Sequence, residues 1–202
     1  MSAVRQALRR VMTAPQGWMA APLFAMILTL YWRTLAPGAL GGDAGELQFV
    51  PAILSLPHPT GTPLYILLGK LWSLLPLGPT VAWRMNLLAA VSAALAAAIV
   101  FRCVQQVFQS AAGGWVAALA LALGTTYWEQ AVLADKYAFN ALWVAIVLAL
   151  ALGWGRSRAP ATLSWLALAY GLSLTHHRTM TLFAPPLLGY VWWHERAALW
   201  RD

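Results

Sequence analysis

Charged side chains are too scarce in this chain to cover a water-facing surface. Only 9% of its 202 residues are charged and 61% are hydrophobic, whereas a soluble domain carries about 25% charged residues. Twelve tryptophans agree with this reading, because indole rings favour the boundary between lipid and water. We therefore expect an all-α integral membrane fold, in which helices satisfy the backbone polar groups within lipid.

The net charge of +7 does not by itself indicate a nucleic-acid partner. Nucleic-acid binding needs a concentrated basic face, and here the basic residues stand singly or in small groups between apolar runs. The single cysteine, Cys103, excludes an internal disulfide and is interpreted as a helix-packing residue.

The apolar runs predict about six membrane crossings, since a helical crossing takes ~20 mostly apolar residues. The predicted crossings are 17–36, 82–103, 113–133, 138–155, 161–176 and 179–194. A further apolar piece, 63–77, is short for a crossing, is bounded by prolines and carries Lys70. We interpret it as a helix lying along the membrane surface. Residues 1–202 thus form one transmembrane domain, and the outer loop 37–81 carries interfacial helices.

Basic residues orient the six crossings. The first run reads as an uncleaved signal anchor rather than a cleaved signal peptide, because it is long and lacks a small-x-small cleavage motif. With the N-terminus in the cytoplasm, eight of the thirteen Lys and Arg residues fall on the inner side, in agreement with the positive-inside rule. These are Arg5, Arg9, Arg10, Arg102, Arg156, Arg158, Arg196 and Arg201. A crossing at 63–77 would instead flip every later loop.

The same topology gathers the ionisable motifs on the outer face of the membrane. Ionisable groups at membrane depth are costly and usually functional, so their convergence predicts a site there. The residues are Asp43, Glu46, His58, Lys70, Arg84, Asp135, Lys136, His176, His177 and Arg178.

Asp43 and Glu46 lie three residues apart after two glycines, a spacing that puts both carboxylates on one face of a helix. Such a pair can hold a metal ion or take up a proton. The structural alternative is a capping box, with Asp43 as the N-cap of a helix and Glu46 three residues later.

The stretch PHPTGTPLY holds His58 in a rigid loop and starts a helix at Pro63, where free backbone N–H groups suit an anion. Arg84 suits a phosphate. It stands with Asn86 at the outer start of the second crossing, and Lys70 lies on the surface helix. The structural alternatives are a stiff loop with a surface histidine, and cations that reach lipid head groups.

Asp135, Lys136 and Tyr137 follow the third crossing in the string WEQAVLADKYAFN. Asp135 either pairs with Lys136 or faces the same cavity as Asp43. A private pair is not favoured, because neighbours in sequence point in different directions on a helix.

The string THHRTM puts His176, His177 and Arg178 in a row after the fifth crossing. Adjacent histidines seldom share a metal geometry, and no H-E-x-x-H motif accompanies them. A polar patch for a phosphate or a sugar is therefore expected, with a helix-end cluster at the interface as the structural alternative. The chain has no Walker loop, G-x-S-x-G or Rossmann fingerprint, so ATP-driven transport and serine hydrolysis have no support.

The string GGDAGELQFVPAILSLPHPTGTPLYILLGKLWSLLPLGPTVAWRMNLLAA resembles the opening of a family of membrane glycosyltransferases. This is the family of the animal transmembrane O-mannosyltransferase of plexin-type receptors and its bacterial relatives, within the GT-C superfamily. The resemblance continues through WEQAVLADKYAFNAL and GLSLTHHRT and covers about residues 20–185. Its most specific block is Asp-x-x-Glu followed by His-Pro-x-Gly-x-Pro-Leu-Tyr.

The resemblance implies transfer, with inversion, of a mannose-like hexose from a polyprenyl-phosphate carrier to a protein or lipid hydroxyl. The reaction would take place on the outer face of a membrane, which the bacterial relatives suggest is a bacterial inner membrane. Asp43 would be the catalytic acidic residue, acting directly or through a divalent metal such as Mg²⁺ or Mn²⁺, the only cofactor that the resemblance suggests. Arg84, His177 and Arg178 would, by their chemistry, hold the carrier phosphate.

Two departures from the family pattern matter. Asp135 stands where relatives usually carry glutamate, which shortens the reach of the carboxylate. The chain also stops soon after 179–194, whereas family members usually continue through a seventh helix, so we expect an incomplete module. This leaves two alternatives open: a non-catalytic membrane subunit that packs against a larger partner in a complex, and, more weakly, a small transporter.

The predicted site residues fall into two groups. The catalytic group is Asp43, Glu46 and Asp135, and the substrate-binding group is His58, Lys70, Arg84, Asn86, Tyr137, His176, His177 and Arg178. No residue is assigned as a metal ligand.

Overall fold

The computed structural model describes residues 17–59 and 61–199, and every regular element within them is helical. Helices fill this part of the chain with short connections, as the apolar composition predicts. The elements are η1 (Gly17–Met19), α2 (Ala20–Arg33), α3 (Gly42–Ile53), α4 (Pro63–Ser73), α5 (Val81–Phe108), α6 (Ala111–Ala122), α7 (Thr125–Ala131), α8 (Lys136–Ser157), α9 (Pro160–Leu174), η2 (Arg178–Phe183) and α10 (Ala184–Leu199).

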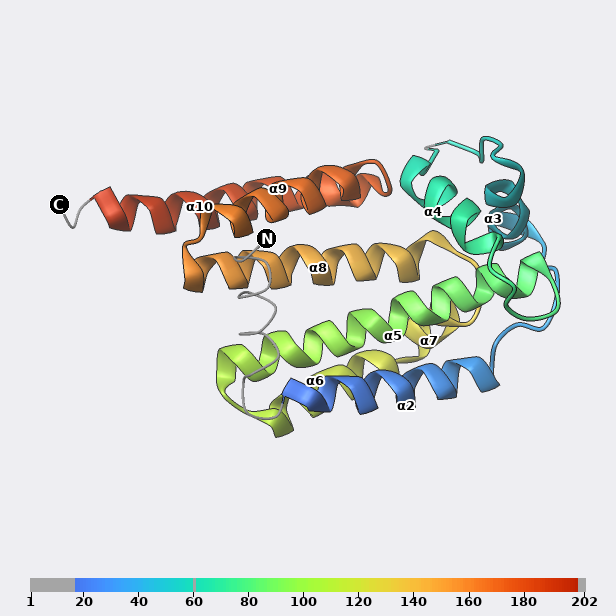
Figure 1. Cartoon of the computed structure of the whole chain (residues 1–202), viewed down its shortest axis with the longest axis horizontal. Helices are drawn as coiled ribbons and strands as arrows, with labels where there is room; N and C mark the ends of the chain where they lie inside the picture. The colour runs from blue at the N-terminus through green and yellow to red at the C-terminus, as the bar shows by residue number, and fades with distance from the viewer. Residues whose placement is uncertain (1–16, 60, 200–202) are drawn as a thin grey trace.

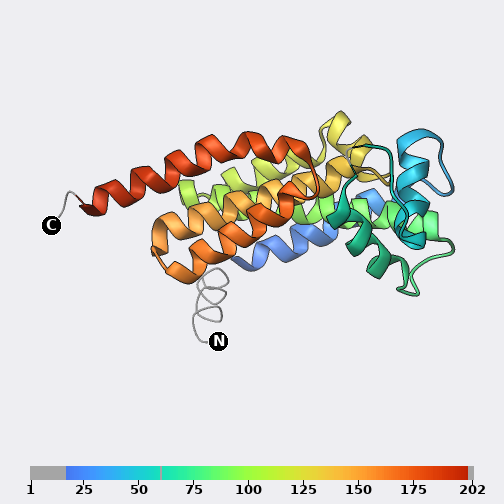
Figure 2. The same ribbon diagram turned by 90° about the horizontal axis from the view of Figure 1, so that it is seen from above.

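The long helices run back and forth between two ends of an elongated bundle (Figure 1). Helices α3 and α4 form a separate unit at one end, beyond the bundle helices, and the view from above shows the same arrangement (Figure 2). We call this the α3–α4 end. The turns from α5 to α6 and from α8 to α9 lie at the opposite end.

Helix α5 is the centre of the bundle and packs against α2, α6 and α8. It begins after Thr80, whose hydroxyl accepts a hydrogen bond from the backbone N–H of Trp83 at 3.1 Å, as expected of an N-cap. One face of α5 is lined with buried alanines, which let neighbouring helices approach closely. These are Ala89, Ala90, Ala93, Ala94 and Ala97.

The predicted crossing at 113–133 is two helices rather than one. The helix ends at Ala122 and restarts at Thr125, with Gly124 as the N-cap of α7. The last carbonyls of a helix lack partners within it. Here the hydroxyl of Tyr31 donates to the carbonyl of Ala122 at 2.8 Å. A neighbouring helix therefore satisfies the backbone at the break, as a non-aqueous environment requires.

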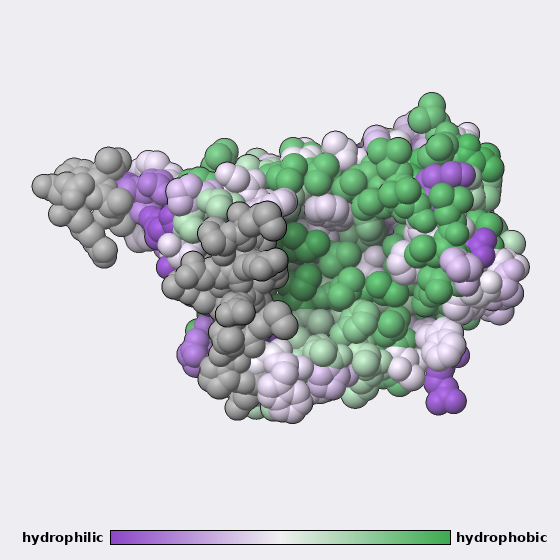
Figure 3. All heavy atoms as spheres, viewed as in Figure 1, coloured by the Kyte–Doolittle hydropathy of each residue, from purple (hydrophilic) through white to green (hydrophobic). Residues whose placement is uncertain are grey.

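Two helices, α5 and α8, are long and apolar enough to cross a membrane. The other predicted crossings correspond to shorter helices of 12 to 16 residues. At 1.5 Å per residue these reach about 18 to 24 Å, short of a hydrocarbon core of about 30 Å. Six crossings therefore stay a prediction. Hydrophobic residues nonetheless cover much of the face between the two ends (Figure 3).

Segment 63–77 contains a distinct short helix, α4, which begins at Pro63 as predicted. The most exposed leucines of this segment, Leu67, Leu71 and the C-cap residue Leu74, follow a spacing of four and three residues and so share one face. This pattern agrees with a helix lying on a membrane surface, which remains a prediction.

The charged residues that the topology assigns to the inner side are only partly described. Arg102, Arg156 and Arg158 lie at the opposite end from α3 and α4, as predicted. Four further arginines of that set lie outside the described residues: Arg5, Arg9, Arg10 and Arg201.

Candidate active site

The first turn of α3 is built by glycines. Gly41 is the N-cap, Gly42 has a positive φ of 63°, and a side chain at Gly45 would meet the carbonyl oxygen of Leu40 at 2.1 Å. The alternative of a capping box is wrong, because the helix begins before Asp43 and no side chain caps it. Asp43 instead lies in the first turn, where the helix dipole favours a negative charge.

His58 lies between the two carboxylates of α3. One oxygen of Glu46, Oε1, accepts from the backbone N–H of His58 at 2.8 Å, and the other bonds to the Nδ1 of its ring. The Nε2 of the same ring is 3.5 Å from Oδ2 of Asp43. The predicted sharing of a face by Asp43 and Glu46 is confirmed, and the loop that follows α3 contributes the imidazole between them.

Lys136 joins this group from the start of α8. Its Nζ donates to Oδ2 of Asp43 at 3.0 Å, with the Lys136 side chain 17% exposed and that of Asp43 58% exposed. The backbone N–H of Lys136 donates to Oδ1 of Asp135, the N-cap of α8. The two neighbours therefore form no private side-chain pair, as predicted. The sequence places Lys136 on the same outer face but assigns it no catalytic or binding role.

The three carboxylates lie in two kinds of surroundings. The hydrogen bond and charge of Lys136, followed by the charge of His58, lower the pKa of Asp43. The hydrogen bond from His58 lowers the pKa of Glu46. Burial raises the pKa of Asp135. Asp43 and Glu46 are therefore ionised at neutral pH, and Asp135 takes up a proton more readily than an ordinary aspartate.

Asn86 is completely buried and its amide makes three hydrogen bonds. Its Oδ1 accepts from Nε2 of Gln48 at 2.9 Å and from the backbone N–H of Ala134 at 2.8 Å, and its Nδ2 donates to the carbonyl of Ala36 at 2.8 Å. Gln48 in turn bonds to the backbone of Gly38 and Leu40. We therefore propose that Asn86 positions the site rather than contacting substrate, with Gln48 as a partner that the sequence reasoning missed.

His176 and His177 lie in different environments. His176 is buried, and its Nε2 is 3.0 Å from the carbonyl of Lys136. His177 is partly exposed, 5.8 Å from the ring of exposed Tyr137, and its Nδ1 bonds to the Thr179 hydroxyl at 2.7 Å. Arg178 is exposed beside it. The structure thus brings these residues to the α3–α4 end, next to the start of α8.

The side chains of Lys70 and Arg84 donate hydrogen bonds to backbone carbonyls. The Nζ of Lys70 donates to Ala52 at 2.6 Å and the Arg84 guanidinium to Leu77 at 3.4 Å. Neither forms an ion pair within the described part of the chain. Their binding roles stay predictions, and the structure does not place them in the group around Asp43.

A divalent metal ion does not fit the side chains as they are arranged. Mg²⁺ prefers six oxygen ligands, yet the Asp43 carboxylate is paired with Lys136 and that of Glu46 is bonded to His58. Among residues 17–59 and 61–199, no group of three or more His, Cys, Asp or Glu residues is arranged to hold a metal ion. We therefore derive no chemical step through a metal.

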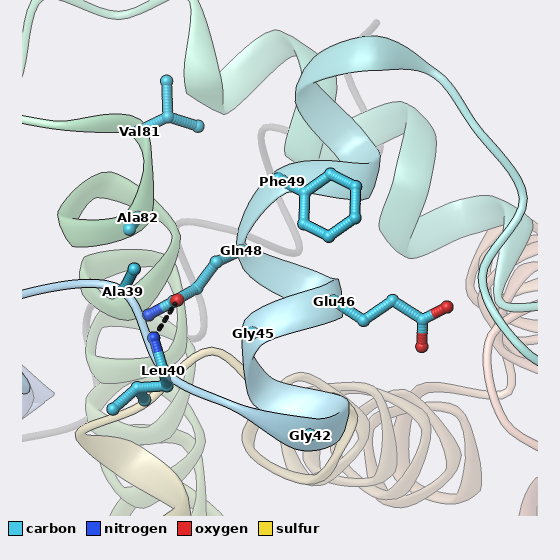
Figure 4. A pocket seen from close by; sticks show the side chains of 9 residues that line it. All are labelled: Ala39, Leu40, Gly42, Gly45, Glu46, Gln48, Phe49, Val81 and Ala82. Atoms are coloured by element: carbon cyan, nitrogen blue, oxygen red, sulfur yellow. Dashed lines mark hydrogen bonds between the residues drawn. The ribbon is translucent and has the colours of Figure 1, made fainter.

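A cavity of about 600 Å³ lies on the other side of α3, against the start of α5. Its lining is apolar apart from Glu46 and Gln48. Figure 4 shows Gln48 turned toward Leu40, while Glu46 points away from Val81 and Ala82. Glu46 is thus part of the cavity lining, while its carboxylate bonds to His58.

Comparison with known proteins shows to which family the chain belongs. Residues 43–200 match the family model described as the protein O-mannosyl-transferase TMEM260 N-terminal domain. The chain is 33% identical to the mouse protein O-mannosyl-transferase TMEM260 over 166 residues, which are 80% of this chain and 24% of the mouse protein. It is 26% identical to the Dictyostelium discoideum protein of the same name over 138 residues, 67% of this chain and 17% of that protein. No solved structure matches.

The chain spans about a quarter or less of the length of these relatives. The matched range begins at Asp43 and includes His58, Lys136 and His176. Because the family model covers most of the chain, the chain belongs to the family of the protein O-mannosyl-transferase TMEM260 N-terminal domain.

Proposed function

We propose that this chain carries the catalytic outer loop of a membrane glycosyltransferase. It transfers a mannose-like hexose from a polyprenyl-phosphate carrier to a hydroxyl group of a protein or lipid on the outer membrane face. The names of the relatives supply the class of reaction. The single observation that supports the site is the exposed Asp43 carboxylate, held between Lys136 and His58 at the end of the bundle.

Asp43 acts as the general base in this proposal. The acceptor hydroxyl gives its proton to the Asp43 carboxylate while its oxygen bonds to the anomeric carbon of the hexose. The bond from that carbon to the phosphate oxygen breaks, and the electron pair leaves with the polyprenyl phosphate. Attack from the face opposite the leaving group inverts the anomeric carbon. A carboxylate that is ionised at neutral pH suits this role, although its lowered pKa makes it a weak base.

Lys136 supplies the positive charge that the leaving phosphate needs. Its ammonium group pairs with Asp43 in the described arrangement. A phosphate that draws Lys136 away removes the main cause of the lowered pKa of Asp43 and so makes the carboxylate a stronger base. Binding of the donor and activation of the acceptor are coupled in this way through one lysine. Arg178 and His177, exposed or partly exposed nearby, are further partners for the phosphate.

The test is transfer of radiolabelled mannose from a polyprenyl-phosphate donor by the purified 202-residue chain in lipid. Asp43→Asn should abolish transfer, whereas Glu195→Gln, the same change at the opposite end of the bundle, should retain it. Transfer by the Asp43→Asn protein would remove Asp43 from the mechanism. Absence of transfer by the unchanged chain would reject an independent enzyme and favour the alternative of a subunit that acts with a partner.

A further inference from the structure

Five buried polar atoms at the start of α4, in α8 and in the turn after α9 have no hydrogen-bond partner among the described residues. They belong to Thr62, Tyr65, Asn140, Trp143 and His176. Three of these side chains surround Phe139, whose ring centroid is 5.6 Å from that of Tyr65, 4.8 Å from that of His176 and 6.2 Å from that of Trp143. Buried side-chain polar atoms are nearly always paired. A group of unpaired ones therefore indicates a place where polar groups from outside the chain can bind.

The geometry defines which atom of His176 is free. Its Nε2 is 3.0 Å from the Lys136 carbonyl, which can only accept, so Nε2 carries the proton. Burial lowers the pKa of His176 to about 4, so the ring is neutral at physiological pH. Its Nδ1 is then an acceptor without a donor, on a side chain that is only 2% exposed.

Tyr65 offers the complementary group. Its side chain is 1% exposed, and its ring stacks on His176 with centroids 6.1 Å apart and planes 27° apart. Burial, and then the negative charge of Asp135, raise the pKa of its hydroxyl. The hydroxyl therefore stays protonated and can donate. Tyr65 thus supplies a donor and His176 an acceptor beside the start of α8, where Asp135 is the N-cap.

We propose that Tyr65, His176 and Asp135 form a subsite for the hydroxyl groups of a neutral hexose ring. The inference rests on the proposed function and deepens it, because it names the part of the site that takes the sugar of the donor. Adjacent sugar hydroxyls can donate to Nδ1 of His176 and to Asp135, and can accept from the Tyr65 hydroxyl. The aromatic rings around Phe139 supply the apolar surface against which a sugar face can pack.

The charges of the subsite favour a sugar over a phosphate. A neutral imidazole and a protonated tyrosine carry no positive charge, and the Asp135 carboxylate repels an anion. Of the cations of this region, Lys136 is paired with Asp43 and Arg178 is exposed. The phosphate and the hexose of one donor are thus assigned to neighbouring but different residues.

Tyr65 and His176 are closed off in the described conformation, since their unpaired atoms have almost no exposed surface, whereas Asp135 is half-buried. A sugar can reach them only when α4, which carries Tyr65, moves away from the first turn of α8. His176 bonds to the backbone of Lys136, whose side chain holds Asp43 on α3. Release of the Lys136 ion pair by a phosphate would loosen the contact between the α3–α4 unit and α8.

The test measures binding of methyl α-mannoside to the 202-residue chain in lipid nanodiscs by saturation-transfer-difference NMR. Tyr65→Phe should weaken binding by about tenfold, the value of one good hydrogen bond, without lowering the thermal unfolding midpoint, because the lost hydroxyl has no partner. Tyr127→Phe is the matched control. Its hydroxyl donates to the carbonyl of Ala93 at 3.0 Å, so this variant should lose stability and keep binding.

Unchanged binding by Tyr65→Phe would overturn the subsite, and so would a loss of both stability and binding, which would mean that the hydroxyl has a structural partner. A second measurement needs no variant: deoxy-mannosides should bind the unchanged chain more weakly at one or more ring positions. Equal binding of every deoxy-mannoside would also overturn the proposal. Binding that depends on Tyr65, in a chain that transfers no sugar, would leave the subsite standing and reject the proposed function alone.

Discussion

Asn86 shows how much of the site depends on one buried side chain. Its amide joins the segment after α2, helix α3 and the segment before α8 through three hydrogen bonds. These are the three parts of the chain that carry or adjoin Asp43 and Asp135. A hydrophobic residue of similar size would leave the Ala36 carbonyl and the Ala134 N–H without this partner, and Nε2 of Gln48 would keep only its bond to Gly38.

We expect Asn86→Leu to lower the free energy of unfolding by roughly 3 kcal/mol, because each unpaired buried group costs about 1 to 3 kcal/mol. The measurement is thermal or denaturant unfolding in detergent. Asn140→Leu is the matched control, since the amide of Asn140 makes only a long hydrogen bond of 3.4 Å to Thr179. Similar losses in the two variants would show that the Asn86 network contributes little to stability.

Lys136 controls the pH dependence of the proposed base. The carboxylate form of Asp43 is active, so the rate falls as the pH drops through the pKa of Asp43. Lys136 is the main cause of the lowered pKa. Lys136→Met should therefore raise that pKa and move the acid limb of the kcat/KM profile to higher pH. The measurement is the pH–rate profile of sugar transfer.

The second lysine of the chain supplies the control for this shift. Lys70 donates to the carbonyl of Ala52 and contacts no carboxylate among the described residues. Lys70→Met should leave the pKa of the acid limb in place, whatever it does to the rate. An acid limb that stays in place in Lys136→Met would show that Asp43 is not the titrating base.

At the scale of helices, α3 and α4 meet through a glycine. A side chain at Gly69 of α4 would meet Cβ of Pro51 at 2.8 Å and Cε of Met85 at 2.9 Å. The methionine end can move aside, but the proline ring of α3 cannot. The close approach of α3 to α4, and with it the position of Asp43 over α8, therefore requires glycine at this position.

Gly69→Ala should destabilise the protein and reduce sugar transfer, because it separates α3 from α4. The same change at Gly171 of α9 meets no atom within 4 Å and should be neutral or stabilising by up to ~1 kcal/mol, the difference in helix propensity. Unfolding midpoints of the two variants test this contrast. Equal midpoints would mean that α3 and α4 are loosely packed.

The sequence predicts helices better than it predicts contacts between them. Apolar runs located α5 and α8, and Pro63 located the start of α4. The helix break before Gly124 was not predicted, because apolar residues continue on both sides of it. The side chain that donates to the free carbonyl at the break, that of Tyr31, is 91 residues away.

Contacts between residues that are distant in sequence also limit prediction of the site. The distribution of basic residues along the sequence is enough to predict that Asp43, His58 and Asp135 lie at one end of the molecule. The pairing of Lys136 with Asp43, however, joins residues 93 positions apart. The Gln48–Asn86 bond spans 38 positions. Local spacing contains no information about such pairs, because they depend on how helices pack.

At the scale of the whole molecule, the two ends differ in charge. The α3–α4 end carries the carboxylates Asp43, Glu46 and Asp135 together with the lysines Lys70 and Lys136, whereas the opposite end carries Arg102, Arg156 and Arg158. On that side Arg196 lies over the ring of Trp193 at 3.9 Å, a pairing suited to a lipid–water interface. An apolar face separates the two ends (Figure 3). This distribution favours a molecule that lies across a membrane with its arginine-rich end in the cytoplasm.

Cysteine labelling tests this orientation, since Cys103 is the only native cysteine and can be replaced by serine. Leu56→Cys places a thiol in the loop after α3, where the native side chain is 89% exposed. Ser157→Cys places one at the exposed last residue of α8. A membrane-impermeant maleimide added to intact cells should label position 56 at once and position 157 only after lysis. Labelling of both from outside would mean that segment 63–77 crosses the membrane, and it would place the arginines outside as well.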